Sequence, residues 1–80
     1  MDYKEIARSI IRQYRAKEDI NQEEFAKRAG ISKRSVSQIE SKKHVKDATL
    51  NRALSLIGYE LEVTKQVKPI GNPDNIAIKP

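Results

Sequence analysis

Two helix starts follow one another closely in the sequence, at Asn21 and at Ser32, with room for one short helix between them. Glu24 stands three residues after Asn21, which is the spacing of a capping box with Asn in the role of Ser or Thr. Gly30 then ends the first helix, because glycine accepts the left-handed backbone that closes many helices. The sequence therefore predicts a helix over 22–29, a tight turn, and a second helix capped by Ser32.

The second of these helices has an apolar side and a basic side. Ile31 leads into it and pairs with Val36 as a hydrophobic staple, and Ile39 continues the apolar side. Its first turn holds Lys33 and Arg34, although the positive end of the helix dipole makes cations unfavourable there by a few tenths of a kcal/mol each. Two interpretations remain open at this stage: the two cations face an anionic partner, or they are ordinary solvated residues.

Two further helices are predicted from apolar spacing. Residues 3–17 carry apolar side chains three and four positions apart, with charges between them, which indicates an amphipathic helix. Asp47 is a plausible N-cap for a last helix that Gly58 ends. The apolar stripe of that last helix consists of Leu50, Ala53, Leu54 and Ile57.

Residues 59–65 alternate between apolar and polar side chains, which is typical of a half-buried strand. One strand cannot satisfy its own backbone, so it needs a partner. Two partners are considered: the same strand of a second copy, which we favour, or residues 75–79 folding back. We expect one domain over 1–66, with its dimerisation strand at 59–66, and an irregular tail over 67–80.

Composition excludes several classes of protein. The chain has 80 residues, no cysteine and a net charge of +5, which favours one small domain and an anionic partner. A charged beginning and the lack of a long apolar run exclude a secretory signal and a membrane span. The single histidine, His44, makes a metal site improbable, and no hydroxyl has a paired base and orienting carboxylate. We expect a cytoplasmic protein without cofactor or enzymatic activity.

Residues 22–41 resemble the helix-turn-helix of the lambda-repressor-like (XRE-type) DNA-binding family. The resemblance extends less sharply over 3–58, and Lys42 stands where the family has a glycine. It implies a mainly α fold of four to five helices, with a C-terminal β-strand that pairs across a dimer. The residues that match the family pattern are Phe25, Ala26, Ala29, Gly30, Ile31, Val36 and Ile39.

The resemblance also gives roles to individual residues, since this family places the start of its second motif helix in the major groove of double-stranded DNA. The residues expected to contact bases lie on its exposed face: Lys33, Arg34, Ser37 and Gln38. Those expected to contact phosphates are Gln22, Ser35, Lys42, Lys43 and Lys46. For Ser35 local capping is the alternative, and for the three lysines it is a solvated loop.

The ending of the chain resembles that of HipB-like antitoxins within this family, in which a C-terminal strand pairs with its symmetry mate. This implies a homodimer on a palindromic operator, with Tyr59, Leu61 and Val63 at the interface, and a HipA-like toxin kinase as a further partner. The implied function is an autoregulating repressor that acts as antitoxin. The alternatives are a stand-alone prophage or plasmid repressor, and a protein-interaction module without DNA binding.

Overall fold

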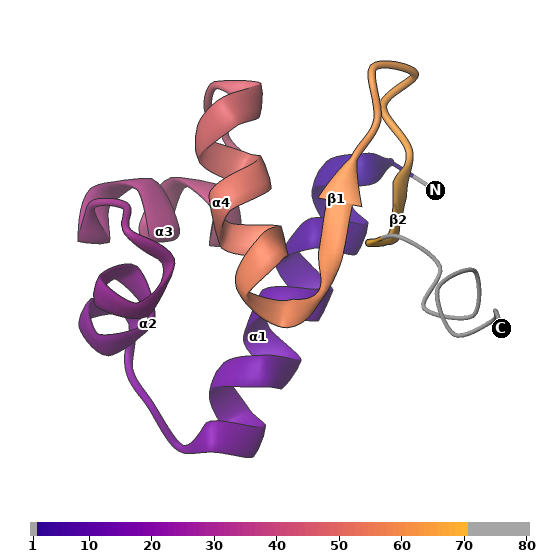
Figure 1. Cartoon of the computed structure of the whole chain (residues 1–80). Coiled ribbons are helices and arrows are strands. Elements are labelled where there is room, and N and C mark those ends of the chain that lie inside the picture. Colours follow the sequence, from indigo (N-terminus) through magenta and orange to yellow (C-terminus); the bar gives the residue numbers. More distant parts are fainter. Residues whose placement is uncertain (1, 71–80) are drawn as a thin grey trace, which may run out of the picture.

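The structure is a computed structural model that describes residues 2–70. Helices α2 and α3 lie on one side of α1 and α4, and a β-hairpin lies on the other side (Figure 1). The predicted mainly helical fold is therefore confirmed, with a small antiparallel sheet added. The elements in chain order are α1 (Tyr3–Glu18), α2 (Gln22–Ala29), α3 (Lys33–Glu40), α4 (Asp47–Ile57), β1 (Tyr59–Leu61) and β2 (Val67–Pro69).

One apolar core joins all four helices and the first strand. Phe25 of α2 is fully buried and meets the ring of Tyr14 edge-on, with 5.8 Å between the ring centroids. This geometry suits two aromatic rings, because the positive edge of one faces the negative face of the other. The buried apolar residues are Ala7, Ile11, Phe25, Ala26, Val36, Ile39, Leu50, Ala53, Leu54 and Leu61.

The two helix starts predicted from the sequence are present. The Glu24 N–H donates to the Asn21 side chain over 2.8 Å, and the Ser35 N–H donates to the Ser32 hydroxyl oxygen over 3.0 Å. Gly30 has a φ of +73°, as its role in ending α2 requires. The capping box is only half formed, since the Glu24 carboxylate instead accepts a hydrogen bond from Arg28.

The prediction that Asp47 caps the last helix is wrong. Helix α4 begins at Asp47 itself, and its N-cap residue Lys46 makes no capping bond with its side chain. The Asp47 carboxylate instead accepts hydrogen bonds of 2.6 and 2.8 Å from the ammonium group of Lys65. That ammonium also lies 5.7 Å from the centre of the Tyr3 ring, so it links the hairpin to α1 and to α4.

The strand that we expected to pair across a dimer has a partner within its own chain, and its pairing with a second copy stays a prediction. β1 is antiparallel to β2, with Leu61 opposite Val67. Residues 67–69 are therefore a strand, and the prediction of an irregular tail from residue 67 is wrong for them. The other partner considered, at 75–79, lies outside the described residues. The strand is also shorter than predicted, because the chain turns over 62–66.

The second edge of β1 is occupied by a side chain. The N–H of Leu61 donates to the Asn51 side-chain oxygen over 2.6 Å, and the Asn51 amide nitrogen donates to the Leu61 carbonyl over 3.5 Å. Asn51 lies on α4, so the helix binds the outward-facing backbone groups of the strand. The Asn51 amide thereby adds to the contacts of Lys65 and Leu61 that hold the hairpin to the helices.

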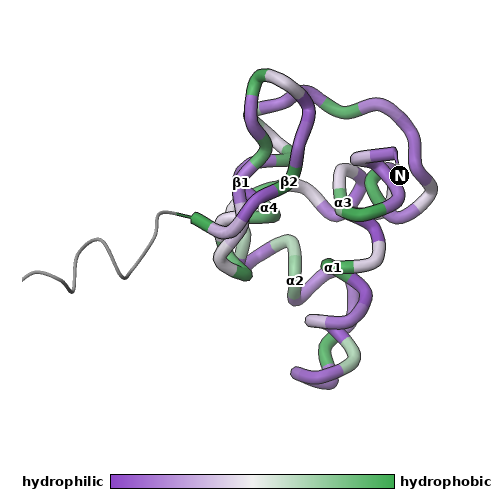
Figure 2. Tube along the Cα trace, turned by 90° about the vertical axis from the view of Figure 1, so that its right-hand side faces the viewer, coloured by the Kyte–Doolittle hydropathy of each residue, from purple (hydrophilic) through white to green (hydrophobic). Residues whose placement is uncertain are grey.

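Of the three residues predicted to form an interface, Tyr59 and Leu61 lie on the face of β1 that packs against the core, and Val63 does not. Leu61 is 7% exposed and belongs to the core, Tyr59 is half-buried, and Val63 is 94% exposed. The alternation stops because the strand ends at Leu61, and Val63 lies in the turn. Figure 2 shows the hairpin at the top of the view, with a hydrophobic position at its outer end.

Candidate nucleic-acid interface

The residues predicted to contact bases lie together on the exposed side of α3. Lys33, Arg34 and Ser37 are exposed and Gln38 is half-buried, while Val36 on the opposite side is fully buried. Within residues 2–70 these four polar side chains make no hydrogen bond or ion pair with another side chain. Their donors and acceptors are therefore available to a ligand.

The start of α3 differs in charge from the other helix starts of the described chain. The first turns of α1, α2 and α4 contain carboxylates, whereas the first turn of α3 contains Lys33 and Arg34 and no acid. Ser32 satisfies one of the free N–H groups at this end. The helix dipole and both cations thus act in the same direction and favour an anion.

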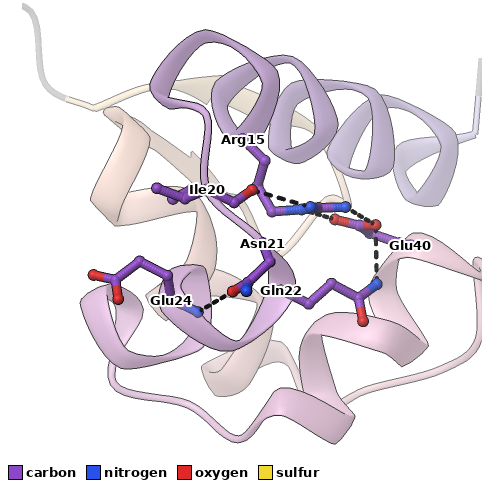
Figure 3. Close-up of polar contacts among 6 residues, drawn as sticks. All are labelled: Arg15, Ile20, Asn21, Gln22, Glu24 and Glu40. Carbon is purple, nitrogen blue, oxygen red and sulfur yellow. Dashed lines mark hydrogen bonds and ion pairs between the residues drawn. The ribbon is translucent and has the colours of Figure 1, made fainter.

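A nearly buried carboxylate at the end of α3 fixes the helix to its neighbours (Figure 3). The Arg15 guanidinium donates two hydrogen bonds to Glu40, of 2.7 and 2.8 Å, and a third of 3.2 Å to the Ile20 carbonyl. The Gln22 amide donates to the same carboxylate over 3.1 Å. These contacts join α1, the start of α2 and the end of α3, so they set how α3 is presented.

The charge state of Glu40 follows from these contacts. Its side chain is only 9% exposed, and burial alone would raise the pKa of the carboxyl group. The hydrogen bonds from Arg15 and Gln22 act in the opposite direction and outweigh burial, so the pKa of Glu40 is lowered. The bond to Glu40 likewise raises the pKa of the Arg15 guanidinium. Both groups are therefore ionised at neutral pH.

The residues predicted to contact phosphates are used in different ways. Lys43 and Lys46 are exposed and have no carboxylate partner within 2–70. The Gln22 amide donates one of its two hydrogens to Glu40, and the second hydrogen can donate to another acceptor. Ser35 accepts a 3.0 Å bond from the Ser32 hydroxyl, which is the local capping considered as its alternative. Lys42 forms an ion pair of 3.0 Å with Glu5.

Lys42 has a left-handed backbone, with a φ of +60°. This is the position where the family pattern has a glycine, so the chain keeps the turn geometry without the residue that favours it. The turn is closed by bonds from the Lys42 N–H to the Ile39 carbonyl, 3.0 Å, and from the Lys43 N–H to the Gln38 carbonyl, 2.8 Å. The departure from the pattern therefore leaves the end of α3 intact.

The Arg15–Glu40 pair was missed by the sequence analysis. The two residues are 25 positions apart, so no local spacing relates them. The usable signal is the position of Arg15 on the polar side of α1, one turn before the helix ends, together with Glu40 at the end of α3.

Comparison with known proteins agrees with this geometry. The family model described as Helix-turn-helix matches residues 11–63, well over half of the chain. The chain therefore belongs to the helix-turn-helix family, in its lambda-repressor-like (XRE-type) form, and is a DNA-binding transcription regulator. No curated protein matches the chain, and no solved structure does. Among the described residues, no helix has both the length and the apolarity to cross a membrane.

Proposed function

We propose that this protein is a sequence-specific repressor that inserts the N-terminal half of α3 into the major groove of its operator. The observation that carries this proposal is the pair of unpaired cations, Lys33 and Arg34, at the positive end of a helix whose outer face has no partner within the described chain. In water this arrangement is unfavourable, whereas beside a polyanion it is favourable. A domain bound in this way represses by covering the operator.

The exposed side chains of α3 suit the reading of base edges. Arginine can form a bidentate contact with guanine, and glutamine can do so with adenine. We therefore assign base reading to Arg34 and Gln38, supported by Lys33 and Ser37. Gln22, Lys43 and Lys46 form the proposed set of phosphate contacts, which position the domain without reading sequence. Ser35 and Lys42 are weaker members, because each is engaged within the chain.

A homodimer on a palindromic operator is part of the proposal. A single α3 offers only four side chains to the bases, and each good bidentate contact discriminates by about 1–3 kcal/mol. Two copies double the length of sequence that is read, when their α3 helices enter successive major grooves about 34–36 Å apart. Leu61 does not belong to the proposed dimer contact, since it is buried in the core of its own chain.

The antitoxin role remains a prediction from the resemblance of residues 59–65 to the ending of HipB-like proteins. That resemblance predicted a strand free to pair with a second copy, and here β1 pairs with β2. A HipA-like toxin kinase as partner rests on the same resemblance. We therefore propose a repressor without assigning it a toxin.

A binding experiment tests the base-reading roles. A duplex selected from a random-sequence pool is compared with a scrambled duplex of the same composition. Arg34→Ala and Gln38→Ala should each weaken binding to the selected duplex by about 1–3 kcal/mol and relax the preference at one base pair. Lys43→Ala should weaken binding to both duplexes alike.

Two results would count against the proposal. Equal losses on the two duplexes for Arg34→Ala would remove this residue from the base-reading set. Wild-type binding that is absent, or insensitive to salt, would favour the protein-interaction module instead, because phosphate contacts always make binding salt-dependent. The stoichiometry of the same titration, two chains per duplex or one, tests the dimer.

A further inference from the structure

A second basic element lies beside the proposed interface, on α1. Arg12 is exposed and lies one helical turn before Arg15, so the two side chains share one side of the helix. Arg12 and Arg15 line a shallow hollow with Ile20, where the chain leads from α1 into α2. This hollow ends two residues before Gln22, the first residue of α2 and a proposed phosphate contact.

Of the two basic and two acidic side chains in this region, only Arg15 and Glu40 form an ion pair with each other within the described chain. Glu40 is neutralised by the bidentate bonds of Arg15, which leaves the charge of Arg12 as the net charge of the three. Asp19 also lines the hollow, but no ion pair joins it to Arg12 within the described chain. Arg12 lines the hollow beside Arg15, and Arg15 holds the Glu40 carboxylate. Arg12 is thus a cation on α1 without an ion-pair partner among residues 2–70, and it lies beside the Arg15–Glu40 pair.

The position of Arg12 relative to Gln22 follows from their common neighbour. Gln22 donates to Glu40 from the start of α2, and Arg12 lines the hollow beside Arg15, which donates to the same carboxylate from α1. Both therefore lie along the edge of α3 that faces α1. In the proposed docking, a DNA strand that borders the groove occupied by α3 and passes Gln22 would continue along this edge.

We propose that Arg12 contacts the phosphate backbone of the bound DNA, so that the interface extends from the helix-turn-helix onto α1. This inference rests on the proposed function and deepens it. Gln22 and Arg12 would contact phosphates of the same DNA strand. The Arg12 contact would not distinguish one base pair from another. Arg8, one turn before Arg12, is less available, because it shares the Glu5 carboxylate with Lys42.

The test measures the salt dependence of binding to a short fluorescent duplex of mixed sequence. Arg12→Gln should flatten the slope of log K against log salt concentration by about 0.9, the change expected for one lost phosphate contact. Lys17→Gln is the matched control, since it removes the same charge from an exposed position of the same helix on another face. It should leave the slope unchanged. Arg12→Lys, which keeps the charge, should retain the wild-type slope.

The outcomes separate this inference from the proposed function. If the wild type binds the duplex and Arg12→Gln has the same slope as Lys17→Gln, the α1 contact does not exist, although the repressor proposal stands. If Arg12→Gln loses affinity only for a selected duplex, its effect is on base reading and the inference is overturned. Wild-type binding that does not depend on salt overturns both proposals. Thermal melts of each variant at the wild-type midpoint exclude loss of folding as the cause.

Discussion

At the scale of single residues, Lys42 in the turn after α3 has an unfavourable backbone conformation that its side-chain contact offsets only slightly. Lys42 adopts a left-handed backbone at +60°, which costs a residue with a Cβ about 1–2 kcal/mol relative to its ordinary conformations. Its side chain forms the 3.0 Å ion pair with Glu5, which is exposed and so contributes little. The proposed phosphate role of Lys42 competes with this pair.

Substitutions at Lys42 separate these effects. Lys42→Ala and Lys42→Gly both lose the ion pair, but only glycine removes the left-handed strain. Lys42→Gly should therefore be about 1 kcal/mol more stable than Lys42→Ala in urea unfolding. The control is Lys43, which has no positive φ, so that Lys43→Gly should be no more stable than Lys43→Ala. Equal stabilities of the two Lys42 variants would show that the turn is not strained.

Contacts between residues close in the sequence were predictable, whereas contacts between different helices were not. The caps at Asn21 and Ser32 were predictable because donor and acceptor lie three positions apart, so the signal is local. Glu40 and Arg15 belong to different helices, and their pairing depends on how those helices pack. The exposed face of α3 was predictable from periodicity, whereas the engagement of Lys42 and Ser35 within the chain was not.

At the scale of elements, the Glu40 carboxylate connects α1, α2 and α3, in addition to the apolar core and the Arg28–Glu18 ion pair of 3.3 Å between α2 and α1. The lowered pKa of Glu40 means that its charged form stabilises the fold. This contribution is fully present above the unfolded pKa, near 4.5, and is lost as the pH falls through the lower folded value. The contacts that hold α3 against α1 and α2 should therefore become less stable at acid pH.

Glu40→Gln tests this dependence. At neutral pH the variant should be less stable by about 1–3 kcal/mol, the range for hydrogen bonds to a charged group. As the pH is lowered below about 4.5, the difference between wild type and variant should shrink, because Glu40 then becomes neutral in the wild type as well. The lowered pKa of Glu5 affects both proteins and cancels in the difference. A difference that stays constant from neutral to acid pH would contradict this account.

The hairpin is the element whose pairing the sequence concealed. β2 has three residues and includes Pro69, so it shows no alternating pattern. The turn contains none of the Asn-Gly or Asp-Gly pairs that mark tight hairpins, and Lys65 takes a positive φ of 64° in their place. The strand β1 was therefore predicted correctly as a strand, but its partner was sought in a second copy or at residues 75–79 and not at 67–69.

At the scale of the whole molecule, Leu61 contributes to the core of its own chain, whereas the exposed Val63 is available for a contact between copies. Leu61→Asp places a charge in the core and should destabilise the fold by roughly 3 kcal/mol or more, as an unpaired buried charge does. Val63→Asp lies on an exposed turn and should change stability by less than about 0.5 kcal/mol. Circular dichroism melts check both values.

The variant Val63→Asp then tests whether the exposed turn takes part in dimer formation. Because Val63→Asp should stay folded, sedimentation velocity on it reports whether the exposed turn belongs to the contact between copies. A dimer that persists in Val63→Asp would place that contact elsewhere. Melts in which both variants lose equal stability would contradict the assignment of Leu61 to the core and Val63 to the turn.

The amide of Asn51 has a consequence for what the small sheet can become. A two-stranded sheet ordinarily presents two open edges, and open edges allow strands from other molecules to add and aggregates to grow. Here the Asn51 side chain occupies the Leu61 backbone groups on the β1 edge, and β2 carries Pro69, which has no N–H to offer. Each edge of the hairpin is thus blocked at one residue, Leu61 on β1 and Pro69 on β2, which makes the addition of a strand from another molecule less favourable.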